Sequence, residues 1–255
     1  MIIVKVFKNS RQFMQKIVIA NWKMNFPHEV YQQIKNNNLN TTNLIICPPQ
    51  AYLSQSCLEI GSNTKIAAQN ISHLGGSNGA FTGEISAKMI KDFGCEFCLV
   101  GHSERRIHLN ETNADIKQKI NYLHEHNLTA ILCIGETLQE REQNLSQEIL
   151  ERQLRECLPK SANTTNTIVA YEPVWSIGTN ICASTAQIEE AFNFISMVLI
   201  KEFELHLDLV YGGSVSPSSF KEIISIKKLQ GVLVGSAGLK IEFLKELLNT
   251  VEDKL

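Results

Sequence analysis

Long apolar runs and blocks of one charge are both missing from this 255-residue sequence. No stretch of eighteen apolar residues occurs, so the sequence predicts no transmembrane helix. Lys and Arg number 24 against 26 Asp and Glu, and the basic residues form no stripe. This balance argues against binding to nucleic acid or to an anionic membrane, although a few local groups suffice to hold a small anion.

Motifs for cofactors and metals are also missing. Neither the G-x-G-x-x-G of dinucleotide-binding sheets nor the G-x-x-x-x-G-K-[ST] phosphate loop is present. Cys95 and Cys98 form a C-x-x-C without a second such pair, so we expect no zinc site there and predict a buried strand holding both thiols. We expect no metal and no cofactor. Seven cysteines, an odd number at irregular spacing, indicate free thiols and a reducing compartment, most simply the cytoplasm.

The first thirteen residues carry no recognisable export signal. A secretory signal places its charges before its apolar core, whereas Lys5, Lys8 and Arg11 follow the apolar residues here. Two interpretations of residues 1–13 stay open: an extension without fixed structure, or a start assigned too early, with Met14 the true first residue. Residues 14–255 are expected to form a single domain, because no linker or low-complexity run divides them.

Eight short runs of consecutive apolar residues, typical of strands buried on both faces, recur along the chain. They span residues 16–21, 43–48, 65–70, 97–102, 129–135, 167–172, 207–213 and 231–236. Segments with helical spacing separate them, and the clearest are residues 114–126, 184–203, 216–225 and 241–251, with weaker ones at 28–36 and 51–60. Ser184 and Gln187 have the spacing of a capping box, and Pro217 suits a helix start.

This alternation predicts an α/β fold, a single-domain (β/α)8 barrel with eight parallel strands. An open doubly wound sheet is the alternative, and the absence of a glycine-rich first crossover counts against it. The carboxyl ends of barrel strands meet at one face, where the active site lies. The residues that should meet there are Asn21, Lys23, His102, Glu172, Ser214, Gly235 and Ser236.

The predicted set combines a carboxylate, an imidazole, an ammonium group and two glycine-rich turns. Glycine-rich turns after the last two strands can bind phosphate through backbone N–H groups. The set suits proton abstraction beside a carbonyl, with Glu172 as the base and His102 and Lys23 stabilising an enediolate. Each side chain alone has an ordinary structural interpretation, so the inference depends on their common position at the strand ends.

Seven blocks of the sequence resemble the triosephosphate isomerase family. They are "NWKMN" at 21–25, "AFTGEIS" at 80–86, "VGHSERR" at 100–106, "CIGE" at 133–136, "YEPVWSIGT" at 171–179, "YGGSV" at 211–215 and "VGSAGL" at 234–239. Their order and spacing follow the family. The resemblance implies an enzyme that interconverts dihydroxyacetone phosphate and D-glyceraldehyde 3-phosphate through an enediol(ate), without a cofactor, in glycolysis and gluconeogenesis.

The resemblance also implies a role for each matched residue. Glu172 would move the proton between carbons, His102 would polarise the carbonyl and shuttle protons between the oxygens, and Lys23 would supply positive charge. Substrate binding is expected from Asn21, Gly178, Ser214, Gly235 and Ser236, and support from Glu104 and Tyr211. Family members are usually homodimers, in which the loop matching residues 70–86 inserts into the partner and Thr82 reaches across.

Two positions depart from the family pattern. Ser236 stands where a second glycine is usual, which suits phosphate binding only if the backbone there does not need a positive φ. Residues 180–183 replace a Gly-Lys-Thr-Ala block at the far end of the active-site lid. Asn180 tolerates left-handed backbone, so we expect a working lid whose opening and closing rates differ.

Two other functions stay open. The first is another phosphate-binding barrel isomerase acting on a larger sugar phosphate, which needs a wider pocket and no "YEPVW" lid. The second is a non-catalytic barrel that serves as a binding module. That function predicts a damaged catalytic set, yet all four expected side chains are present.

Overall fold

The computed structural model describes residues 16–252 except 37, 38, 40 and 180. The expectations for residues 1–13, Met14 and Asn180 therefore lie outside the described residues. Within the described part of the chain, no helix is both long and apolar enough to cross a membrane.

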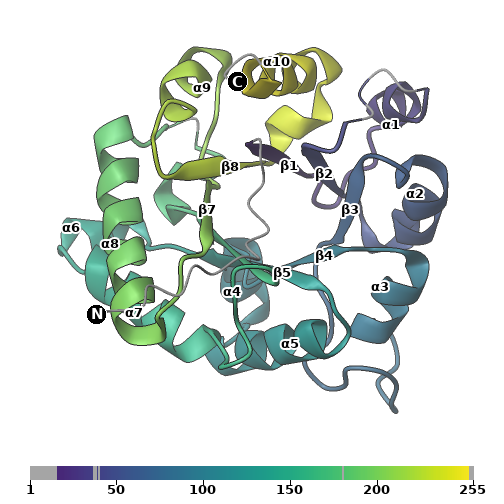
Figure 1. Cartoon of the computed structure of the whole chain (residues 1–255), viewed down its shortest axis with the longest axis horizontal. Helices are drawn as coiled ribbons and strands as arrows, with labels where there is room; N and C mark the ends of the chain where they lie inside the picture. The colour runs from purple at the N-terminus through teal and green to yellow at the C-terminus, as the bar shows by residue number, and fades with distance from the viewer. Residues whose placement is uncertain (1–15, 37–38, 40, 180, 253–255) are drawn as a thin grey trace, which may run out of the picture.

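Eight parallel strands form a closed barrel in chain order, and the last strand pairs with the first (Figure 1). The strands are β1 Ile17–Asn21, β2 Leu44–Cys47, β3 Lys65–Ala68, β4 Phe97–Val100, β5 Thr129–Ile134, β6 Thr167–Tyr171, β7 Asp208–Tyr211 and β8 Leu229–Val234. Each lies within or overlaps one of the eight apolar runs, so the barrel prediction is confirmed.

Helices surround the barrel as an outer ring (Figure 1). The α-helices are α1 His28–Lys35, α2 Leu53–Ile60, α3 Ala87–Phe93, α4 Ser103–Leu109, α5 Asn113–Glu125, α6 Leu138–Glu142, α7 Ser146–Cys157, α8 Thr185–Phe203, α9 Pro217–Ile223 and α10 Ile241–Glu252, with 3-10 turns η1 Gln50–Tyr52, η2 Val174–Ser176 and η3 Ser236–Leu239. The capping box of Ser184 and Gln187 is present, and Pro217 begins α9 as expected.

Alternation along the strands divides the core into two layers. Ile17 and Ile19 of β1 belong to the cluster that fills the barrel, whereas Val18 and Ala20 pack in the cluster between sheet and helices. Successive side chains of a strand point to opposite faces, and both faces here are covered by apolar groups. The fully apolar runs in the sequence are the consequence of this double burial.

The Cys95–Cys98 segment differs from its prediction in one respect. Both thiols are buried, as expected. The strand β4 begins only at Phe97, however, so Cys98 lies in the strand and Cys95 lies in the turn that follows α3. The left-handed Gly94 ends α3 and accounts for the turn.

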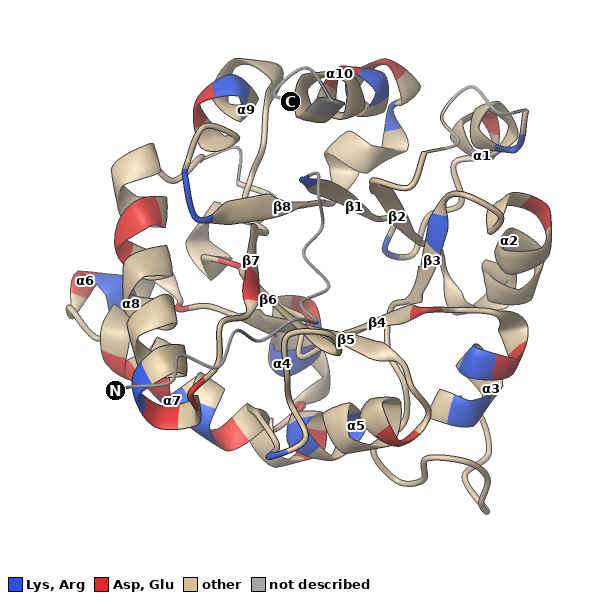
Figure 2. Cartoon of the chain, viewed as in Figure 1, with Lys and Arg blue, Asp and Glu red and all other residues tan. Residues whose placement is uncertain are grey.

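Charged side chains of both signs lie mainly on the outer helices, and only a few stand on the strands (Figure 2). Asp208, the first residue of β7, is an exception because its side chain is partly buried at the amino end of a strand. Burial raises the pKa of Asp208 from 3.8 to about 6.

We expect Asp208→Asn to change the pH dependence of stability. Since the native pKa of Asp208 exceeds its ordinary value, the native state binds more protons than the unfolded chain between about pH 4 and pH 6, and the free energy of unfolding falls as pH rises through that window. Asn stays neutral and lacks this loss. Urea unfolding of both proteins on either side of the window measures the effect; a stability difference between variant and wild type that does not grow with pH would contradict it.

Candidate active site

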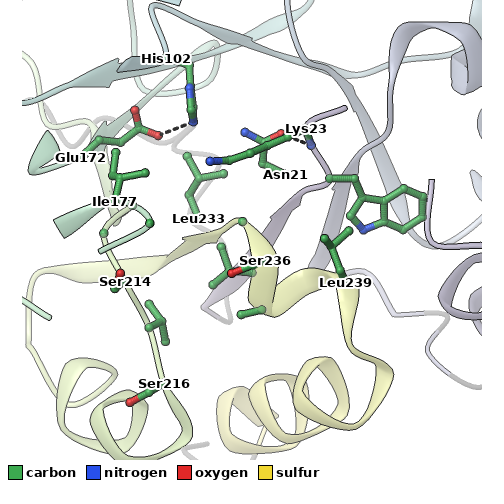
Figure 3. Close-up of a pocket in the computed structure, with 18 of the residues that line it drawn as sticks. Asn21, Lys23, His102, Glu172, Ile177, Ser214, Ser216, Leu233, Ser236 and Leu239 are labelled. Carbon is green, nitrogen blue, oxygen red and sulfur yellow. Dashed lines mark hydrogen bonds and ion pairs between the residues drawn. The ribbon is translucent and has the colours of Figure 1, made fainter. Parts of the chain in front are cut away.

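A cavity of about 310 Å³ opens at the carboxyl ends of the strands. Figure 3 shows side chains from β1 and β8, and from the residues that follow β4, β6 and β7, gathered around it. The structure brings together in its lining eight of the residues expected from the sequence: Asn21, Lys23, His102, Glu172, Gly178, Ser214, Gly235 and Ser236. Glu104 and Tyr211 lie behind this lining, and Thr82 lies on an exposed loop.

Glu172 directly follows β6 and is 2% exposed. Its Oε1 lies 3.5 Å from His102 Nε2 (Figure 3), and its Oε2 accepts a hydrogen bond of 3.3 Å from the backbone N–H of Ser103. Gly212 provides the space for this carboxylate, because a Cβ there would lie 2.7 Å from Glu172 Cγ. The carboxylate therefore reaches the cavity from a nearly enclosed position.

His102 forms the N-terminal cap of α4. Its Nδ1 accepts the backbone N–H of Glu104 at 3.2 Å. A neutral imidazole that accepts at Nδ1 carries its proton on Nε2. The cap thus sets the tautomer and directs an N–H donor toward Glu172 and the cavity.

Lys23 has a left-handed backbone with φ of 50°. Two side chains hold this conformation: Asn21 Oδ1 accepts the Lys23 N–H at 3.0 Å, and Gln69 Nε2 donates to the Lys23 carbonyl at 2.8 Å. The Lys23 ammonium pairs with Glu104 Oε1 at 2.5 Å. A backbone conformation that is uncommon outside glycine is stabilised here by its neighbours, and it fixes where the ammonium stands.

Gln69 is a residue of this site that was not predicted, although its position after a strand indicated it. It follows β3 directly, at the same edge of the barrel as the residues selected after the other strands. Its amide also donates to the Cys47 carbonyl at 2.8 Å, which joins the ends of β1, β2 and β3.

Backbone N–H groups of three expected residues line another wall of the cavity. Among the described residues, the N–H groups of Gly178, Gly235 and Ser236 have no hydrogen-bond acceptor within the chain. Gly178 has a φ of 70°, and Ser236 begins the short helix η3 without a positive φ. The departure from glycine at position 236 is therefore compatible with this backbone. Ser214 differs, since its N–H is donated to Ser176 Oγ at 3.1 Å.

Residues 173–179 and 181–183 cover one side of the cavity, and a buried carboxylate holds the first part of this segment. Glu136 is fully buried, and its Oε1 accepts Trp175 Nε1–H at 3.0 Å, the Tyr171 hydroxyl at 3.1 Å and Arg141 Nη1 at 3.2 Å. The Arg141 guanidinium also lies 5.1 Å from the Trp175 ring centre. Burial, together with the nearby Glu136 charge, raises the pKa of Tyr171, so this hydroxyl remains a donor.

Neutral groups hold the far end of this segment. The Ser176 hydroxyl donates to the Ile181 carbonyl at 2.6 Å, and the Tyr211 oxygen lies 3.3 Å from that hydroxyl. The Tyr211 oxygen also accepts the Ala183 N–H at 3.4 Å. Tyr211 thus contacts this segment at both Ser176 and Ala183.

Similarity to known proteins agrees with this geometry. The model of the triosephosphate isomerase family matches residues 16–251. A triosephosphate isomerase of Magnetococcus marinus is 39% identical over 88% of this chain and 93% of its own length, and one of Rhodopirellula baltica is 37% identical over 89% and 94%. The crystal structure of triosephosphate isomerase from Bartonella henselae matches with a TM-score of 0.85 and 33% identity, over 94% of this chain and 100% of that chain.

Tyr171→Phe tests the buried anchor. The substitution removes one donor from the enclosed Glu136 carboxylate and nothing else, so we expect the free energy of unfolding to fall by about 1–3 kcal/mol. Tyr122→Phe is the matched control, because its hydroxyl has no hydrogen-bond partner among the described residues. Urea unfolding of the three proteins gives the values, and equal stability of the two variants would refute the assignment.

Proposed function

The chain belongs to the triosephosphate isomerase family, and from that premise we propose how its own residues perform the reaction. The enzyme is an isomerase that interconverts dihydroxyacetone phosphate and D-glyceraldehyde 3-phosphate, a step of glycolysis, and its substrate is a phosphorylated triose. The observation that carries the proposed mechanism is the enclosed contact of the Glu172 carboxylate with His102 Nε2 beside the Lys23 ammonium.

Glu172 acts as the base in this proposal. Its carboxylate takes a proton from the carbon beside the substrate carbonyl, which leaves an enediolate, and returns the proton to the neighbouring carbon. The enclosed position beside Ser103 and His102 supports the role, because proton transfer requires a fixed group within hydrogen-bond reach of the reacting atom.

His102 and Lys23 stabilise the charge that develops on oxygen. The Nε2–H of His102 donates to the carbonyl oxygen as it becomes an enediolate oxygen, and proton transfer through the same nitrogen serves both oxygens. The Lys23 side chain extends toward His102 and Glu172 (Figure 3) and supplies a fixed positive charge. Both groups are held before substrate arrives, which is the condition for strong electrostatic stabilisation.

The substrate phosphate binds on the wall formed by Gly178, Gly235 and Ser236, whose N–H groups are available for an anion. Ser214 lines the same cavity, and its N–H binds the hydroxyl of Ser176 in the lid. Asn21 lines the cavity too, and its side-chain oxygen positions Lys23 by accepting the Lys23 N–H. A cavity of about 310 Å³ is at the small end of ligand sites, which span roughly 300–1,000 Å³. This size supports a triose rather than a larger sugar phosphate.

In this proposal, residues 173–179 and 181–183 belong to the lid. Ile177 and Gly178 line the cavity while Trp175 stays fixed on Glu136. A lid in this position excludes water and keeps the reactive enediolate phosphate from losing its phosphate group. We expect the lid to hinge at two places. One is Trp175, which is held by Glu136, and the other is Ala183, whose N–H is bound by Tyr211.

We further propose a homodimer that uses the loop of residues 70–86. This loop extends beyond the ring of helices (Figure 1). The single chain exposes large apolar side chains beside β1, on this loop and on α4: Met24 at 95%, Leu74, Phe81, Ile107 and Leu109. Burial of such groups against a second copy is favourable, and Thr82 beside Phe81 is the residue that reaches the partner.

All seven cysteines are free, which supports our proposal of a cytoplasmic protein.

Glu172→Asp is the sharpest test of the base. Aspartate withdraws the carboxylate by about one carbon–carbon bond, so we expect kcat to fall by about 10²-fold or more, because a 1 Å misplacement of a catalytic group has an effect of that size. KM should change little, since the phosphate wall is untouched. A coupled assay of triose phosphate isomerisation measures both. Glu59→Asp on the surface of α2 is the control, and equal kcat for the two variants would contradict the proposal.

Ile107→Glu tests the dimer. A charge at the centre of an apolar interface should raise the dissociation constant at least about tenfold, whereas Ile200→Glu, on the exposed face of α8, should leave it unchanged. Light scattering over a micromolar concentration series reports the mass of each protein. A wild-type monomer throughout that series, or equal behaviour of the two variants, would refute the proposed interface.

A further inference from the structure

Cys57 and Cys95 form a thiol pair on the outer side of the barrel, away from the active site. Their sulfur atoms lie 3.7 Å apart, although 38 residues separate them in the sequence. Cys57 stands on α2 and is partly exposed, whereas Cys95 is buried in the turn between α3 and β4. The pair thus has one sulfur that solvent reaches and one that it does not.

The end of α3 brings the two sulfurs together. Gly94 adopts a φ of 101° there, and the Cys95 N–H donates to the Ile90 carbonyl at 3.0 Å, so that the chain reverses against α2. A Cβ on Gly94 would lie 3.5 Å from Cys57 Cβ, which shows how closely the turn packs on this cysteine. Figure 1 shows α2 and α3 side by side, and they are in contact. The short distance is therefore built into the helix packing.

The two thiols differ in their acidity. The hydrogen bond with Cys95 lowers the pKa of Cys57, although partial burial acts in the opposite direction. The same bond, together with burial, raises the pKa of Cys95. Cys57 is also the more exposed of the two sulfurs, so we expect it to be the one that ionises and reacts first. A partly exposed thiolate beside a second thiol is the arrangement of a redox-sensitive pair.

None of the other five cysteines has this arrangement. Cys47, Cys98, Cys133 and Cys157 are buried. Burial raises the pKa of the first three well above the ordinary thiol value and raises that of Cys157 to about 11. Cys182 is partly exposed on the lid, but its neighbour at 3.7 Å is the Ser219 hydroxyl, which cannot form a disulfide.

We propose that Cys57 and Cys95 are a modification site at which a hydroperoxide forms a reversible disulfide. The Cys57 thiolate attacks one peroxide oxygen and breaks the O–O bond, which gives a sulfenic acid and releases hydroxide or an alkoxide that takes up a proton from water. The Cys95 sulfur then attacks the sulfenic sulfur, forms the S–S bond and expels water. Two thiols together lose two electrons and two protons, and the peroxide is reduced. The sulfurs must approach by roughly 1.7 Å to reach the length of an S–S bond.

The position of the pair determines what oxidation changes. Cys95 precedes the amino end of β4, whereas His102 follows its carboxyl end. In this fold the amino ends of the strands contribute to stability and the carboxyl ends to catalysis. We therefore expect the disulfide to leave kcat within about twofold of its reduced value and to raise Tm by several degrees, since it ties two distant points of the unfolded chain.

The test treats the full-length protein with hydrogen peroxide, blocks the remaining thiols with iodoacetamide and maps the peptides by mass spectrometry. The expected product is a peptide pair joined through Cys57 and Cys95, which dithiothreitol separates. Cys57→Ser should abolish that product. Cys95→Ala should leave a sulfenic acid on Cys57 that dimedone captures. Cys182→Ser, which removes the other partly exposed thiol, should form the disulfide as the wild type does.

Relative rates and enzyme activity complete the test. Cys57 should be oxidised at least about tenfold faster than Cys182, because its neighbour favours the thiolate. Three results would each overturn the proposal: free Cys57 and Cys95 after oxidation of Cys182, a product that dithiothreitol does not reduce, or a Cys57–Cys95 disulfide that lowers kcat by clearly more than twofold. A mass-mapped Cys57–Cys95 disulfide in an active enzyme would establish it.

Discussion

Closure of a parallel sheet is the constraint on which the site depends. Every strand must begin at one end of the barrel and finish at the other, so residues as far apart in sequence as Asn21 and Ser236 converge where the first and last strands lie side by side. Hydrogen bonding between β8 and β1 completes the ring and fixes the relative height of the first and last strand ends. The chemistry then requires only that the residue after each strand have the right side chain.

Closure also buries carboxylates that follow the strands, and a buried charge is unfavourable unless other groups compensate it. Glu136 and Glu172 are both buried in this way, but their hydrogen-bond partners differ. Glu136 is fully buried and receives three donors on one oxygen, including the cation of Arg141, so it is a fixed anchor. Glu172 receives one backbone N–H and the imidazole of His102, and faces a cavity. Ion pairing and hydrogen bonds decide which buried carboxylate stays in place and which can react.

The sequence predicts the barrel well because both faces of each strand are buried, and consecutive apolar residues are an unusually clear local signal. The helix start at Ser184 and the end of α3 at Gly94 likewise depend on adjacent residues. The side chains around the cavity were predictable by position, since they follow strands. Gln69 also follows a strand, and the same rule could have selected it. The Glu136 anchor and the Cys57–Cys95 pair were not predictable, because each depends on side chains meeting from segments far apart in sequence. The start of β4 was misplaced for Cys95 because an apolar turn residue and an apolar strand residue look alike.

Glu104 connects His102 and Lys23, the two groups that we propose stabilise the enediolate. Its backbone N–H donates to His102 Nδ1 and so places the imidazole proton on Nε2, while its carboxylate holds the Lys23 ammonium. Both contacts follow from its position in the first turn of α4, where backbone N–H groups lack partners within the helix and a negative charge is favoured by the helix dipole. The proton donor and the cation therefore share one support. Glu104 holds His102 through its backbone N–H and Lys23 through its side-chain carboxylate. A change of the side chain at position 104 would therefore release Lys23 without altering the tautomer of His102.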